Sequence, residues 1–147
     1  KKINSLAELT PKEFNEVKYL LSGVVGIRAE HVVMECARVK EAVKALKAGD
    51  IVELGRLLNE SHYSLRDLYE VTGKELDALS AFARNEVECL GSRMIGAGFG
   101  GCTISIVKKS GVEAFIRHVS KAYQDAIGYK ASFYETSIED GITVEKL

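Results

Sequence analysis

The sequence predicts an α+β domain in which four helices precede a small antiparallel sheet, and two observations indicate this. Over roughly the first 90 residues, apolar side chains recur at every third or fourth position, which is the spacing of amphipathic helices. From about residue 91 to residue 147 the pattern changes to short runs rich in β-branched residues, which favour strands, beside a glycine-rich loop. We therefore expect one domain over 1–147, helical at first and built around the glycine loop and a sheet afterwards.

Two helices are expected before residue 50. Thr10-Pro11-Lys12-Glu13 has the pattern of a capping box with proline at the first helical position, and it predicts a helix over Pro11–Leu21. Gly23 and Gly26 interrupt the pattern, and a longer helix is expected over Arg28–Lys47, ended by Gly49 as a left-handed cap. Its three- and four-residue spacing predicts one buried stripe, formed by Val32, Cys36, Val39, Val43 and Leu46.

Two further helices complete the helical part. Asp50 is a suitable cap for a leucine-rich helix over Ile51–Tyr69. Thr72-Gly73-Lys74-Glu75 has the pattern of a second capping box, and it opens a helix with one apolar face made of Leu76, Leu79, Phe82 and Ala83.

The remaining chain predicts a ferredoxin-like β-loop-β-α-β-β tail with an antiparallel sheet covered on one face. Ser92–Ile95 and Cys102–Lys108 are the expected first strands. A third capping box, Ser110-Gly111-Val112-Glu113, opens a helix that stops at Gly128. The last two strands are expected at Ala131–Ser137 and Ile142–Val144, joined by a turn at Asp140-Gly141.

Composition excludes several function classes. The chain has 147 residues, 46% hydrophobic and 28% charged, with a net charge of −1. These values are typical of a soluble globular domain and give no electrostatic attraction to nucleic acid or an anionic membrane, so neither is an expected partner. Cys36, Cys89 and Cys102 do not have the spacing of metal ligands, so we expect free thiols, no metal site and a cytoplasmic location.

Four glycines lie within six residues of the loop, at Gly96, Gly98, Gly100 and Gly101. A Walker-type phosphate loop needs a lysine and a following helix, and a dinucleotide fingerprint needs a different spacing and a helix, so both are excluded. The loop could be a wide hairpin that needs glycine for its own shape, or a hairpin that a ligand or another chain segment approaches closely. Both possibilities stay open on physical grounds.

Gly91–Cys102, with the core Gly96-Ala97-Gly98-Phe99-Gly100-Gly101, resembles the C-terminal glycine motif of galactokinases, within the GHMP small-molecule kinases. The resemblance extends in order over nearly the whole chain, through Arg28–Val33, Asn59–Asp67 and Tyr69–Thr72. Ile95 departs from the family, which often has threonine before the first loop glycine, and this removes a hydroxyl beside the loop.

The resemblance implies the C-terminal domain of an enzyme that transfers the γ-phosphoryl of Mg-ATP to the anomeric hydroxyl of galactose. It implies that the six residues from Gly96 to Gly101 support the nucleotide's phosphate region. The sugar signature, main phosphate loop and catalytic residues would lie in an N-terminal domain. Because none of those motifs occurs in this sequence, the resemblance implies a C-terminal domain that is inactive alone and has no catalytic or metal-binding residues of its own. The start at Lys1 rather than methionine agrees with the expectation that the sequence is a piece of a longer chain.

Several other polar residues lie outside the glycine loop. Tyr69, Glu70 and Thr72 are expected near an interdomain cleft, although Thr72 could serve only as a helix cap. We expect His62 and His31 to have packing roles and His118 to be solvated. Two other functions stay open, a non-catalytic binding or regulatory module with the same fold and a kinase of another GHMP substrate such as mevalonate or homoserine.

Overall fold

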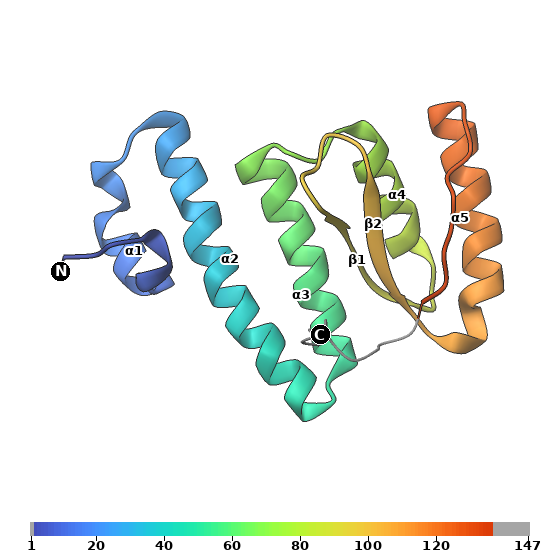
Figure 1. The fold of residues 1–147 in the computed structure, drawn as a ribbon, viewed down its shortest axis with the longest axis horizontal. Helices are drawn as coiled ribbons and strands as arrows, with labels where there is room; N and C mark the ends of the chain where they lie inside the picture. The colour runs from blue at the N-terminus through green and yellow to red at the C-terminus, as the bar shows by residue number, and fades with distance from the viewer. Residues whose placement is uncertain (1, 137–147) are drawn as a thin grey trace, which may run out of the picture.

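The computed structural model describes residues 2–136, and in the view of Figure 1 the two strands lie between α3 and α4, with α1 and α2 to one side and α5 to the other. The helical part contains α1 (Pro11–Val17), α2 (Gly23–Ala48), α3 (Ile51–Ser64) and α4 (Lys74–Asn85). The strands β1 (Cys89–Ile95) and β2 (Cys102–Val107) form an antiparallel pair, and α5 (Val112–Ile127) follows them. The predicted α+β class, with four helices before an antiparallel sheet, is confirmed.

Apolar clusters hold neighbouring elements together. Phe14 of α1 is buried against Ala29 and Val33 of α2. Leu65, Leu76 and Met94 form a second cluster where the end of α3, the start of α4 and β1 meet. The third cluster lies between α4 and α5 and is built on Ala83, Phe115 and Val119.

Helix α2 differs from the prediction in its start and in its buried face. It begins at Gly23, so Gly23 and Gly26 lie inside the helix rather than before it. The side chains buried on α2 are Ala29, His31, Val33 and Ala45. In the expected stripe, Val39, Val43 and Leu46 are 55%, 44% and 49% exposed and Val32 and Cys36 half-buried, so the prediction of a buried stripe is wrong. Periodicity identifies an apolar face but not whether its partner lies in the same chain segment.

The helix starts show which capping patterns the tertiary structure uses. Thr10 and Glu13 form the predicted capping box, and Asp50 accepts a hydrogen bond from the amide of Glu53 at 2.9 Å. The two other predicted boxes are absent because a glycine, Gly73 or Gly111, occupies the cap one residue later than the Thr or Ser of the pattern. The glutamate then falls at the second helical position and cannot reach back to the cap amide.

The predicted tail is only partly found. The backbone over 131–136 is irregular rather than a strand, and Phe133 packs against the cluster between α4 and α5. The burial of one aromatic side chain against two helices therefore replaces the expected strand pairing. Ser137, the turn at Asp140-Gly141 and the strand at Ile142–Val144 lie outside the described residues.

Helix α3 lies along β1, and this contact sets the direction of the hairpin. Gly55 and Gly91 meet without side chains between them, since a Cβ on Gly91 would lie 2.1 Å from the carbonyl oxygen of Gly55. Two amides of β1 donate to side chains of α3: Ser92 to Asn59 Oδ1 at 2.8 Å and Met94 to His62 Nδ1 at 3.1 Å. The loop that follows β1 is thereby held at the end of the molecule where α3 ends (Figure 1).

Candidate functional site

The candidate site is built on the loop Gly96–Gly101, which joins β1 to β2. Four of its residues are glycines with φ of +77° (Gly96), +85° (Gly98), +110° (Gly100) and +103° (Gly101). Phe99 also has a positive φ, +58°, and its side chain is 77% exposed. Residues with a Cβ avoid this backbone region, so the loop needs its glycines for its own path between the strands.

One of these glycines is also required by a close approach. The Phe99 amide donates to the carbonyl oxygen of Val71 at 2.8 Å, and a Cβ on Gly98 would lie 1.9 Å from that same oxygen. Both possibilities left open by the sequence are thus realised, because the loop needs glycines at positive φ for its own path and another chain segment approaches it. A Cβ on Gly96, Gly100 or Gly101 would meet nothing within 4 Å, so these three positions border open space.

The segment that carries Val71 is the one in which cleft residues were predicted. α3 ends in a π-helical segment, Leu65–Tyr69, and the amides of Glu70 and Val71 both donate to the carbonyl of Leu65. Tyr69 and Glu70 are exposed and lie within two residues of the loop contact, whereas Thr72 is only 2% exposed. The structure therefore brings two of the three predicted cleft residues to the glycine loop with their side chains accessible and buries the third.

His62 packs between α3, α4 and β1. Its side chain is fully buried, and because Nδ1 accepts the Met94 amide, the ring proton lies on Nε2, 3.2 Å from Asp77 Oδ1. Burial, followed by the nearby guanidinium of Arg84, lowers the pKa of His62 below its usual range. His62 is therefore a neutral, buried imidazole that accepts a hydrogen bond from β1, which is the packing role that was predicted.

The other two histidines also lie as predicted. His31 is buried on α2, with Nδ1 2.8 Å from Ser64 Oγ, and burial lowers its pKa. His118 is exposed on α5, 3.0 Å from Glu86. None of the three histidines is placed to take a proton from a ligand at the loop.

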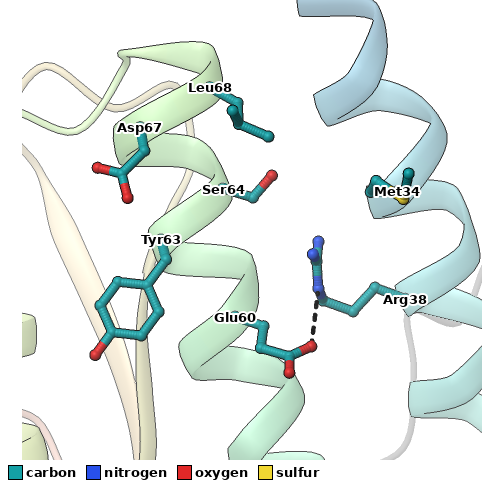
Figure 2. Close-up of a pocket in the computed structure, with 7 residues that line it drawn as sticks. All are labelled: Met34, Arg38, Glu60, Tyr63, Ser64, Asp67 and Leu68. Carbon is teal, nitrogen blue, oxygen red and sulfur yellow. Dashed lines mark ion pairs between the residues drawn. The ribbon is translucent and has the colours of Figure 1, made fainter. Parts of the chain in front are cut away.

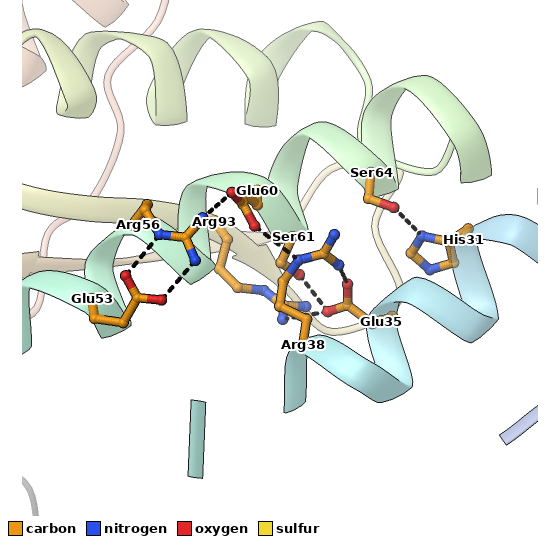
Figure 3. Close-up of polar contacts among 9 residues, drawn as sticks. All are labelled: His31, Glu35, Arg38, Glu53, Arg56, Glu60, Ser61, Ser64 and Arg93. Atoms are coloured by element: carbon orange, nitrogen blue, oxygen red, sulfur yellow. Dashed lines mark hydrogen bonds and ion pairs between the residues drawn. The ribbon is translucent and has the colours of Figure 1, made fainter. Parts of the chain in front are cut away.

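Charged side chains between α2, α3 and β1 neutralise one another (Figure 3). Glu35 lies at the centre of this network, where its carboxylate meets the guanidinium groups of Arg38 and Arg93 and accepts from Ser61 Oγ at 2.5 Å. Arg93, the cation of the sequence nearest to the loop, is thus engaged with Glu35 and Met94 O rather than with the loop. An anion at the loop would meet backbone amides before any side-chain cation of β1.

An open groove between α2 and α3 was missed by sequence analysis, because it depends on how the two helices lie side by side (Figure 2). Its charged side chains are in ion pairs, Arg38 with Glu60 at 3.8 Å between Nε and Oε2 and Asp67 with Arg66 at 2.7 Å. The residues that line it are Met34, Arg38, Glu60, Tyr63, Ser64, Asp67 and Leu68.

A site for Mg-ATP needs ligands for the metal ion and groups that neutralise the phosphates. Within 2–136, no group of three or more His, Cys, Asp or Glu side chains is arranged to hold a metal ion. The loop offers backbone groups and no cation of its own. These residues fit a partial phosphate-side contact with a nucleotide, but they do not fit a resident magnesium site. In the same described range, no helix has the length and apolarity needed to cross a membrane.

Comparisons with known proteins agree with this arrangement. Residues 42–125 match the family model described as GHMP kinases C terminal. The chain is 54% identical over 142 residues to the galactokinase of Clostridium tetani and 51% identical over 140 residues to that of Limosilactobacillus reuteri. These matches cover 96% and 95% of this chain but 36% of each relative, so the chain spans about a third of the curated relatives it matches.

A solved structure gives the same result for the fold. The crystal structure of Lactococcus lactis galactokinase complexed with galactose matches with a TM-score of 0.89 and 47% identity. The match covers 91% of this chain and 35% of that protein.

Proposed function

Because this chain belongs to the family of GHMP kinase C-terminal domains, we propose that it is the C-terminal domain of a galactokinase. The proposed reaction is ATP-dependent phosphorylation of galactose at its anomeric hydroxyl. Galactose, Mg-ATP and an N-terminal domain are the proposed partners, and the location is cytoplasmic. In this proposal all 147 residues form one domain, which lacks catalytic residues and is inactive alone.

A single observation carries the proposed role of the loop. Gly98 and Phe99 are anchored to Val71, while the positions that would bear a Cβ at Gly96, Gly100 and Gly101 border open space. An anchored loop with an unobstructed backbone lets another backbone or a phosphate approach closely. The similarity to galactokinases then supports the phosphate region as the neighbour, with Gly96, Ala97, Gly98, Phe99, Gly100 and Gly101 as contact residues.

The chemistry assigned to this chain is positioning. Phosphoryl transfer depends mainly on alignment and on neutralising the charge of the transferred group, and bound magnesium supplies part of that charge. The loop would fix one wall of the phosphate site through its backbone. Exposed Tyr69 and Glu70, beside the anchored end of the loop, are proposed to border the same cleft.

The test of this role compares two glycines with similar backbone geometry in the complete natural protein. Gly101 and Gly128 have φ of +103° and +95°, and a Cβ on either meets nothing within 4 Å. Gly101→Ala and Gly128→Ala therefore carry a similar backbone strain, but only the first lies in the loop. We expect kcat for galactose phosphorylation to fall about 10- to 100-fold in Gly101→Ala and to stay near that of the unaltered protein in Gly128→Ala.

Equal activity of the two variants would refute the assigned role of the loop. A separate assay tests the proposed division of labour. The 147-residue chain alone should show no galactose phosphorylation, and adding the separately expressed remainder of the protein should restore it. Turnover by the 147 residues alone would contradict the proposal. Phosphorylation of mevalonate or homoserine instead of galactose would favour another GHMP kinase, and no activity in the complete protein would favour a binding module.

A further inference from the structure

We propose that Arg28, on α2, is a positioning residue for the glycine loop. The loop is anchored to Val71, and the segment that precedes Val71 is held by the guanidinium group of Arg28. Arg28 and the loop are about 70 residues apart in the sequence, so only the fold connects them.

Arg28 contacts three consecutive residues of the segment at the end of α3. Its Nη1 donates to the carbonyl oxygen of Leu68, and its Nη2 lies 2.5 Å from Glu70 Oε2. Its guanidinium carbon lies 5.7 Å from the centre of the Tyr69 ring. Tyr69 is also supported by a second residue of α2, because His31 stacks on its ring with 4.5 Å between ring centres and 23° between planes. One turn of α2 therefore fixes the position of Leu68, Tyr69 and Glu70.

The held segment has a backbone that needs support. Glu70 is left-handed, with φ of +57°, which is uncommon for a residue with a side chain. This conformation ends the π-helical segment and turns the chain so that the next carbonyl, that of Val71, reaches the Phe99 amide. If the bonds from Arg28 are lost, Glu70 can relax and move that carbonyl.

The loop cannot keep its position if the carbonyl group of Val71 moves. The Val71 carbonyl oxygen occupies the space that a Cβ of Gly98 would fill, so this oxygen determines where Gly98 and Phe99 lie. A shift of Val71 is therefore transmitted directly to the loop. Gly100 and Gly101, the open part of the loop, follow Phe99 in the chain.

Arginine is the side chain that this arrangement requires. A planar guanidinium can donate to a carbonyl and a carboxylate at once while it lies beside an aromatic ring, whereas an ammonium group is a single compact charge. We therefore expect lysine at this position to keep the ion pair and lose the positioning.

Arg56 provides a matched control. It is likewise partly exposed and bonded to two acceptors, the carboxylates of Glu53 and Glu60 on its own helix. Within residues 2–136 its ion pairs are confined to Glu53 and Glu60, and Figure 3 shows Arg56 between these two glutamates on α3. Arg56→Ala should leave the loop unchanged.

The first readout is hydrogen exchange, which does not depend on activity. In the complete natural protein we expect Arg28→Ala to speed exchange of the Phe99 amide by about tenfold or more, through weakening of its bond to Val71. The Met94 amide, held by His62, should exchange at its original rate in the same sample. Unchanged exchange at Phe99, or equal acceleration at Phe99 and Met94, would overturn the proposal.

The second readout is kinetic, and since the loop's role in catalysis is itself proposed, this part rests on the proposed function. Arg28→Lys should lower kcat for galactose phosphorylation about 10- to 100-fold, with KM for galactose unchanged and with no such loss in Arg56→Ala. If Arg28→Ala does not fold, Arg28→Lys is used for both readouts. A normal kcat in Arg28→Lys with faster Phe99 exchange would overturn the proposed function of the loop, whereas normal exchange would overturn the role of Arg28.

Discussion

The glycine contact between α3 and β1 gives a stability prediction whose sign is opposite to that of helix propensity. Alanine is a better helix former than glycine by about 1 kcal/mol, so Gly55→Ala inside α3 would ordinarily stabilise the protein. Here the added Cβ would lie 2.3 Å from the carbonyl oxygen of Leu90 and 2.6 Å from its carbonyl carbon. The contact is with backbone, which cannot turn away as a flexible side chain can.

The magnitude follows from these two opposing contributions. Overpacking typically destabilises by about 1–3 kcal/mol, and a backbone contact at this distance belongs at the upper end. Subtracting about 1 kcal/mol of gained helix propensity leaves a net loss of about 2 kcal/mol in the free energy of unfolding. For a protein of this size that corresponds to a Tm lower by about 4–8 °C.

Urea unfolding followed by circular dichroism at 25 °C measures this loss. Gly91→Ala should destabilise similarly, because its Cβ would lie 2.1 Å from the carbonyl oxygen of Gly55. Both substitutions block the same contact, so the double variant should lose clearly less than the sum of the single losses. The reasoning is refuted if Gly55→Ala raises the free energy of unfolding, or if the two losses simply add.

Three other predictions concern the strand edge, pH and exposed apolar side chains. Asn59→Leu leaves the Ser92 amide without its acceptor and should lower the free energy of unfolding by about 1–3 kcal/mol. Asn59→Asp keeps an acceptor oxygen there and should lower the free energy of unfolding by less, which urea unfolding of both variants tests. Burial lowers the pKa of His31 and His62 below the ordinary 6.5, so on acidification the unfolded chain binds protons before the folded chain does. The free energy of unfolding should therefore fall as pH drops below about 6.5, by at most about 1.4 kcal/mol per pH unit for each histidine. Unfolding midpoints between pH 8 and 5 should show that slope and a smaller one in His62→Asn; a flat profile would contradict buried neutral histidines. Four apolar side chains near the start of α2 are strongly exposed: Tyr19 (79%), Leu20 (69%), Val24 (57%) and Val25 (60%). The 147-residue chain should therefore self-associate in sedimentation, and the double variant Leu20→Lys with Val25→Lys should do so less; a monomer at all concentrations would contradict this.

Local sequence signals predicted most elements but not their assembly. Thr10 and Glu13 form their predicted box because all partners lie within four residues. The similar patterns at Thr72 and Ser110 failed because a neighbouring glycine could take the cap, and a four-residue pattern does not decide between the two. The exposed Val39, Val43 and Leu46 show the same limit for helix faces, since their periodicity is helical whether or not a partner covers them.

For the glycine loop, too, some features follow from the sequence and others only from the tertiary structure. By itself the sequence determined that the backbone between the two strands must be free to adopt positive φ, that the familiar nucleotide loops are excluded, and that the chain resembles galactokinases. Only the tertiary structure decided that Val71 occupies the space of the missing Cβ of Gly98, that Thr72 is buried while Tyr69 and Glu70 are exposed, and that Arg28 supports this segment. The physical reason is that φ preferences and helix periods act between neighbours in the chain. The position of one carbonyl against a loop 27 residues away depends on how α2, α3 and β1 pack together.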